Sequence, residues 1–216
     1  MASHDYLYAI VDGLPRRWRP PAAGVGGGPV VARAIGDLTL IVTPLAVPPG
    51  RTPGALAVHQ DVVATLLESR AVVPLRFGAL VAAADLDRWL SLHLARVRAA
   101  LAELRGAVEM TVRLLPLDLR AAAPAAAGQL VALATRLIER AGLPGWRYVP
   151  TGGARHACAS LAFLVPRDDV PGFLVRIAPV ASHAEGVAVV PSGPWPPYSF
   201  APALDPGAGA SAALAG

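Results

Sequence analysis

The sequence predicts an α+β protein made of two small domains followed by an extended C-terminal segment. Short β-rich runs and amphipathic helical runs alternate in small groups, without the regular strand–helix rhythm of a large parallel sheet. An Ala- and Pro-rich stretch near residue 120 separates two such groups. A length of 216 residues suits one or two domains. We therefore expect a first domain over residues 1–118, a second over 119–204, and a disordered tail over 205–216.

The first domain opens with a β-rich run at residues 6–11, which predicts a strand. Two more β-rich runs, 30–35 and 38–43, follow a loop rich in Pro, Gly and Arg. They are separated by Gly36 and Asp37. Because glycine supplies the positive φ that a tight turn needs, this spacing predicts a β-hairpin.

Helical periodicity begins after Pro53, where four residues spaced by three or four positions form one apolar stripe: Leu56, His59, Val63 and Leu66. We expect His59 to be a satisfied, partly buried histidine in that stripe. A second helix is predicted from Asp85 to Gly106. Strict alternation of apolar and polar residues over 108–114 then predicts a strand with one wet face.

The second domain is predicted to follow a linker over residues 116–128. Its elements are a helix at 129–141, strands at 146–149 and 157–165 around a turn at 151–153, a helix at 168–178 that Asp168 would cap, and a strand at 185–190. The order helix–strand–strand–helix–strand fits a ferredoxin-like unit.

Missing residue types exclude several classes of chemistry. All nineteen basic residues are arginine, so a lysine-dependent phosphate loop and Schiff-base catalysis are excluded. The single cysteine, Cys158, excludes a multi-cysteine zinc site and an iron–sulfur cluster. We expect no catalytic residues, no cofactor and no metal.

The formal net charge is +4, but the arginines are scattered, so nucleic-acid binding is not expected. The uncharged runs are too short, or too interrupted by proline, to cross a membrane. No signal peptide is visible at the N-terminus. These observations predict a cytoplasmic protein without a membrane partner.

Three stretches of the sequence resemble the gas vesicle GvpF/GvpL family. They are Tyr6-Leu-Tyr-Ala-Ile-Val11; His59-Gln-Asp-Val-Val63 followed by Val73-Pro-Leu-Arg-Phe-Gly78; and Ser192-Gly-Pro-Trp-Pro-Pro-Tyr-Ser-Phe200. The resemblance implies two α+β domains, the first ferredoxin-like. It also implies an accessory role in gas vesicle assembly, with the major shell protein and other accessory proteins as partners. No enzyme activity is implied.

The two later stretches supply the candidate site residues, which would be either architectural or partner-binding. In the first, Pro74 and Gly78 would constrain a turn that carries Arg76 and Phe77. The second would form a polyproline-like strap, either folded back over the body of the protein or docking a partner. Its candidate residues are Trp195, Pro196, Pro197, Tyr198 and Phe200.

Two other function classes remain open from the sequence. A ferredoxin-like regulatory or RNA-binding module would present paired aromatics and arginines on a sheet face. An enzyme would gather His59, Asp61 or Glu68 with Arg76 in one pocket.

Overall fold

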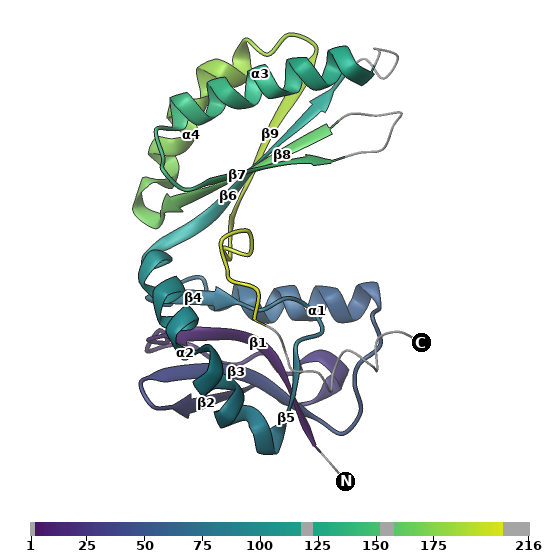
Figure 1. Ribbon diagram of the computed structural model, residues 1–216, viewed down its shortest axis with the longest axis vertical. Coiled ribbons are helices and arrows are strands. Elements are labelled where there is room, and N and C mark those ends of the chain that lie inside the picture. The colour runs from purple at the N-terminus through teal and green to yellow at the C-terminus, as the bar shows by residue number, and fades with distance from the viewer. Residues whose placement is uncertain (1–2, 118–122, 152–157, 205–216) are drawn as a thin grey trace. The chain divides into compact units, whose positions relative to one another are not determined.

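Residues 3–117, 123–151 and 158–204 are described in a computed structural model of the chain (Figure 1). The chain forms two compact units, one of Met1–Gly106 with Pro196–Gly216 and one of Ala107–Trp195. The expected boundary at residue 118 thus falls one strand later than this division, because the strand after Gly106 pairs in the sheet of the second unit. The chain also returns to the first unit after Trp195.

The first unit contains an antiparallel sheet in the order β2-β3-β1-β4, with β5 also paired to β1. Its elements are β1 His4–Asp12, β2 Val31–Ile35, β3 Leu38–Leu45, α1 Pro53–Ala64, β4 Ala71–Pro74, β5 Leu80–Ala82 and α2 Leu86–Glu103. The predicted hairpin is confirmed as β2–β3, with Gly36 at φ +61° in its turn.

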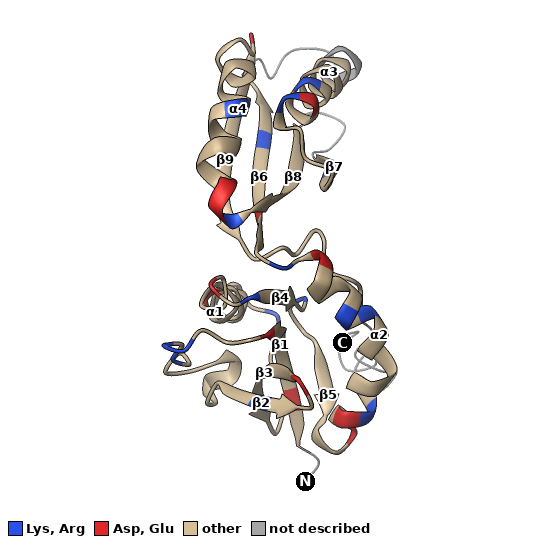
Figure 2. Ribbon diagram, turned by 90° about the vertical axis from the view of Figure 1, so that its left-hand side faces the viewer, with Lys and Arg blue, Asp and Glu red and all other residues tan. Residues whose placement is uncertain are grey.

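The two helices of the first unit lie on opposite faces of its sheet (Figure 2). α1 follows Thr52, whose side-chain oxygen accepts the Ala55 N–H at 3.1 Å. The predicted apolar stripe of α1 is corrected at one position, because Leu56 is 39% exposed while Val62 is buried. The helix is therefore turned so that consecutive residues Val62 and Val63 both face the core beside His59.

The second unit has the chain order βαββαβ and an antiparallel sheet in the order β7-β8-β6-β9. Its elements are β6 Ala107–Pro116, α3 Ala123–Ala141, β7 Trp146–Thr151, β8 Cys158–Pro166, α4 Val170–Ser182 and β9 Val187–Trp195. α3 and α4 lie on the same face of this sheet (Figure 1) and bury one apolar core against it. In the first unit, by contrast, three strands precede the first helix.

Several predicted boundaries in the second unit are corrected. α3 begins at Ala123, so residues 123–128 are helical rather than part of a linker. A 3₁₀ turn precedes α4, and Asp169 takes the N-cap position expected for Asp168, without a side-chain capping bond. β9 continues to Trp195, and its prolines are accommodated because β9 is an edge strand. Residues 152–153 of the turn predicted at 151–153, part of the linker and the tail lie outside the described residues.

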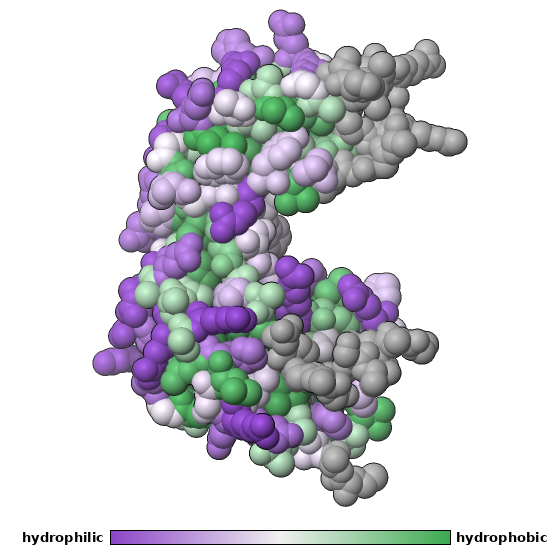
Figure 3. All heavy atoms as spheres, viewed as in Figure 1, coloured by the Kyte–Doolittle hydropathy of each residue, from purple (hydrophilic) through white to green (hydrophobic). Residues whose placement is uncertain are grey.

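Hydrophobic and hydrophilic side chains are interspersed over the surface of each unit that Figure 3 shows. Within the described residues, no helix has both the length and the apolar character that crossing a membrane requires.

Candidate partner-binding site

The candidate site is built on the loop of residues 75–79, between β4 and β5. β4 pairs with residues 9–12 of β1, and β5 pairs with residues 4–6, so the loop spans the gap between these two pairings. Both ends of the loop are bonded to β1: the Leu75 N–H donates to the Tyr8 carbonyl and the Leu7 N–H donates to the Ala79 carbonyl, each at 2.8 Å. Gly78 has φ +92°, a conformation that favours glycine. The predicted constrained turn is therefore confirmed.

A buried hydrogen-bond network supports this loop from below. The Leu75 carbonyl can only accept, so the His59 Nε2–H donates to it, at 3.0 Å. His59 Nδ1 is then the acceptor for the Tyr6 hydroxyl at 2.8 Å. The Tyr6 oxygen in turn accepts the Gly78 N–H at 3.3 Å. One tyrosine thus connects α1, β1 and the loop.

Aromatic rings pack around the network and bury it. The His59 ring lies 5.5 Å from Tyr8, 5.8 Å from Phe77 and 6.4 Å from Tyr198, measured between ring centroids. Burial lowers the pKa of His59 to about 4, against a weaker opposite effect of the Leu75 carbonyl bond. Burial likewise raises the pKa of Tyr6 and of Tyr198 well above the usual range. At neutral pH the cluster is therefore uncharged, as a structural support requires.

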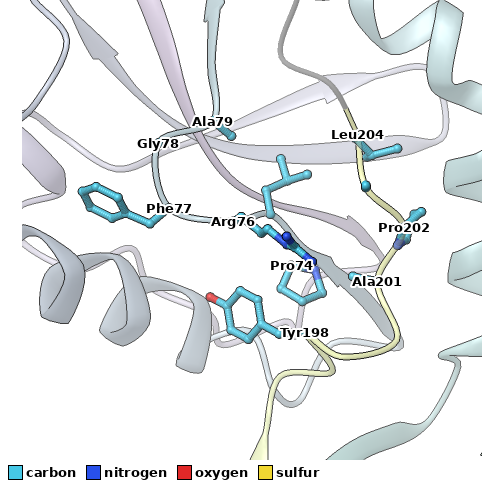
Figure 4. Close-up of a pocket in the computed structure, with 11 residues that line it drawn as sticks. Pro74, Arg76, Phe77, Gly78, Ala79, Tyr198, Ala201, Pro202 and Leu204 are labelled. Atoms are coloured by element: carbon cyan, nitrogen blue, oxygen red, sulfur yellow. The ribbon is translucent and has the colours of Figure 1, made fainter. Parts of the chain in front are cut away.

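A pocket of about 290 Å³ opens between the loop and the C-terminal segment of the same unit (Figure 4). Polar and apolar atoms both contribute to its walls, and the apolar side chains come from Pro74, Leu75, Phe77, Ala79, Tyr198, Ala201, Pro202 and Leu204, among others. Arg76 is the one ionisable group other than Tyr198 among the described residues that line it. Arg76 is exposed and makes no ion pair with any described residue. The pocket therefore combines an apolar wall with one available guanidinium, which suits a carboxylate that carries an apolar group.

The predicted site residues fall into three structural settings. Arg76 and Phe77 both line the pocket, but Phe77 is half-buried and also packs against the core of the first unit. In Figure 4 the Phe77 ring points away from the C-terminal segment. Tyr198 also packs against that core and contributes a wall of the pocket.

The remaining predicted residues separate at Trp195. Pro196, Pro197 and Phe200 are buried and belong to the first unit. Trp195 ends β9 of the second unit and is 49% exposed. Its indole N–H donates to the Ser192 hydroxyl at 3.3 Å.

Sequence reasoning missed the part that Tyr6 and Tyr8 play. The Tyr8 hydroxyl bonds Thr43 at 2.9 Å and accepts the Val25 N–H at 2.7 Å, which attaches the long loop before β2 to the sheet. Two tyrosines in an otherwise aliphatic strand were a usable signal, because buried tyrosines need partners for their hydroxyls. The partners themselves are far away in the sequence and could not be named.

The structure does not assemble the alternatives that the sequence left open. The described residues lining the pocket include Arg76 but not His59, Asp61 or Glu68, so the expected catalytic grouping is not formed there. No cluster of three potential metal ligands occurs among the described residues. Tyr6 and Tyr8, the strand aromatics that such a module would present, are fully buried.

Comparisons with known proteins agree on one family. A family model described as "Gas vesicle synthesis protein GvpL/GvpF" matches residues 5–149 and 120–202. Gas vesicle protein F2 of Halobacterium salinarum is 27% identical over 209 residues, covering 92% of each chain. The fold is similar to the crystal structure of GvpF from Anabaena sp. PCC7120, with a TM-score of 0.79, 18% identity, and coverage of 94% of this chain and 97% of that one. The fold is also similar to the crystal structure of GvpF from Microcystis aeruginosa, with a TM-score of 0.74, 15% identity, and coverage of 93% of this chain and 99% of that one. The chain belongs to the gas vesicle GvpL/GvpF family.

Proposed function

We propose that this protein is a non-catalytic accessory protein of gas vesicle assembly that works in the cytoplasm and at the vesicle. It binds the major shell protein, other accessory proteins, or both. Membership of the gas vesicle GvpL/GvpF family supports a role in gas vesicle assembly. The match to the F2 relative covers 92% of each chain, so this support applies to nearly the whole protein. Within this family we assign the ferredoxin-like class to the second unit, which has the βαββαβ order.

The observation that carries the binding role is the pocket around Arg76. The backbone that carries Arg76 is a loop bonded to β1 at both ends and supported by Tyr6 and His59. A preorganised loop loses little backbone entropy when its arginine pairs with a carboxylate, and arginine and tyrosine are enriched in interface hot spots. The matching partner feature is a carboxylate next to an apolar side chain, which would enter between Tyr198 and Leu204.

Co-purification with the major shell protein tests this proposal. The intact chain should capture the shell protein, and Arg76→Ala should weaken binding by at least about tenfold, since losing a charge-assisted pair costs roughly 1.5–3 kcal/mol. Arg51→Ala is the matched control, because Arg51 is also exposed and lies on a loop away from the lining of the pocket. Circular dichroism and thermal unfolding should show that both variants remain folded.

Two outcomes would count against the proposal in different ways. If the intact chain captures no shell protein, direct shell binding is wrong and the same assay moves to the other accessory proteins. If Arg76→Ala and Arg51→Ala capture as much as the intact chain, the pocket is not the binding surface.

A further inference from the structure

β2 lies at the edge of the sheet in the first unit (Figure 1), and among the described strands it pairs with β3 alone. The two strands are joined by a two-residue turn, so Ile35 lies opposite Leu38. In such a hairpin the residues that flank the turn exchange both backbone hydrogen bonds, and hydrogen-bonded pairs then alternate with non-bonded pairs. The N–H and carbonyl groups of Ala32 and Ala34 therefore point away from β3.

These outward backbone groups are accessible to another chain. Ala32 and Ala34 are exposed, and no backbone hydrogen bond reaches their outward groups from any described residue. A row of unpaired donors and acceptors along a strand is a template for a further extended strand. The edge therefore specifies the conformation of its occupant, which is a β-strand and not a helix.

β2 differs in one respect from the other described edge strands of four residues or more. Each of those strands contains proline, which supplies no N–H to a further strand and restricts the backbone. The prolines are Pro74 in β4, Pro150 in β7, and Pro191 and Pro194 in β9. β2 contains no proline. Of these edges, β2 offers the most regular template for an added strand.

The sequence of β2 is close to a palindrome, which makes the strand complementary to a second copy of itself. It reads Val31-Ala-Arg-Ala-Ile35. When two copies pair antiparallel about Arg33, Ala32 of one copy lies opposite Ala34 of the other, and their outward groups exchange hydrogen bonds in both directions. The same register places Val31 opposite Ile35, and cross-strand pairs of β-branched side chains favour strand pairing. A twofold axis at Arg33 thus satisfies the backbone and the side chains together.

The two central arginines do not oppose this arrangement. Arg33 extends across β3 toward β1, where its guanidinium bonds the Asp5 carboxylate at 2.6 Å. This direction leads away from the edge, so the guanidinium groups of the two copies would point apart. Each arginine also keeps its ion pair with the fully buried Asp5 of its own chain. Pairing of the edges therefore brings no unpaired charge between the two strands.

We propose that two copies of this chain pair through their β2 edges, which joins the sheets of their first units into one continuous antiparallel sheet. β2 is five residues long, so the contact is small. Interfaces that bury less than about 1,200 Å² are typical of weak, transient complexes, and the dimer should therefore dissociate on dilution. None of the edge residues lines the Arg76 pocket, so this inference does not depend on the proposed binding site.

Analytical ultracentrifugation combined with amide hydrogen exchange tests the proposal on the full chain. As the concentration rises from about 10 to about 500 μM, the sedimentation coefficient should increase toward that of a dimer. Over the same range, exchange of the Ala32 and Ala34 amides should slow about threefold or more. Exchange of the Arg33 amide should change little, because this amide already bonds to β3.

Two substitutions at one position separate backbone pairing from other contacts. Ala34→Pro removes an outward donor without removing a bond to β3, and it should keep the chain monomeric. Ala34→Ser retains the N–H and is the matched control, which should dimerise like the parent. Circular dichroism should show that both variants fold, and if Ala34→Pro does not fold, the exchange measurement on the parent decides. Arg76→Ala should leave the dimer unchanged.

Four results would overturn the proposal. The first is a parent chain that stays monomeric up to about 500 μM. The second is a dimer that forms without protecting the Ala32 and Ala34 amides, and the third is equal dimerisation of Ala34→Pro and Ala34→Ser. The fourth is protection of these amides by the major shell protein but not by a second copy, because a foreign strand would then be the occupant.

Discussion

The buried histidine of α1 makes the stability of the first unit depend on pH. His59 is 1% exposed, and both ring nitrogens are engaged, with Tyr6 and with the Leu75 carbonyl. Protonation of Nδ1 would remove the acceptor for the Tyr6 hydroxyl and place a charge among aromatic rings. Replacing His59 with Gln removes the titrating group and keeps an amide that can donate to Leu75.

The sign and size of the effect follow from the pKa of His59. In the unfolded chain it titrates near 6.5, whereas burial lowers the pKa in the folded protein to about 4. Between these values the unfolded chain binds a proton that the folded chain does not, so the free energy of unfolding falls as pH decreases through this range. A difference of about 2.5 at about 1.4 kcal/mol each gives a loss of about 3 kcal/mol between pH 6.5 and pH 4, with little change above pH 6.5.

Urea unfolding at a series of pH values from 7.5 to about 4 measures this loss. Trp18 and Trp89 report on the first unit once Trp146 and Trp195 are replaced by Phe. Titrating groups shared by the parent and His59→Gln cancel in the comparison. The stability difference between the two proteins should therefore shrink by about 3 kcal/mol from the top to the bottom of the series.

His183→Gln is the control, because His183 is exposed and belongs to the second unit. It should retain the pH dependence of the parent. If the parent and His59→Gln lose stability in parallel between pH 6.5 and pH 4, the buried neutral histidine is not responsible and the argument fails.

Two further predictions concern the support of the Arg76 loop and the packing of the loop before β2. Tyr6→Phe removes the hydroxyl that bonds His59 and Gly78 and should lower the free energy of unfolding by about 2 kcal/mol, measured by urea unfolding; an unchanged value would refute the network. Gly24→Ala places a methyl group against two buried hydroxyls and should cost about 1–3 kcal/mol, whereas Gly54→Ala, in α1 with open space around it, should be neutral or stabilising by up to about 1 kcal/mol. Equal effects of the two glycine substitutions would contradict this packing argument.

The elements that could be predicted from the sequence are those with local signals. The β2–β3 hairpin is specified by a glycine at the turn, and its strands pair with their sequence neighbours. The start of α3 was misplaced because Pro124 was interpreted as part of a linker. Proline is tolerated in the first turn of a helix, where its missing N–H would have no partner, and Pro124 is the second residue of α3.

The assignment of β6 to a domain could not be made from local patterns. Its alternation of apolar and polar residues correctly indicated a strand with two different faces, but not the sheet to which it belongs. β6 pairs with β8 and β9, which lie much later in the sequence. Only the partner strands decide the sheet, and α3 separates β6 from β8 while both α3 and α4 separate it from β9.

The turn at the candidate site could be predicted from the sequence, but the buried hydrogen bonds that support it could not. Pro74 and Gly78 indicated a constrained loop, and the positive φ of Gly78 confirms it. The bonds from Tyr6 to His59 and to Gly78 join residues 53 and 72 positions apart. Such contacts depend on strand register and helix rotation, neither of which a short motif specifies.

The three stretches by which the sequence resembles its family have a common structural explanation. Tyr6 of the first stretch bonds His59 and Gly78 of the second, and Tyr198 of the third packs beside His59. These residues are therefore parts of one buried cluster, and changing any of them alters the loop as well as its neighbours. Arg76 differs, because its side chain is exposed and no described residue pairs with it. If a Tyr198 or Phe77 variant lost partner binding, the cause could be either a weakened loop or a lost contact with the partner. If Arg76→Ala lost partner binding while its stability stayed unchanged, Arg76 itself would be the contact.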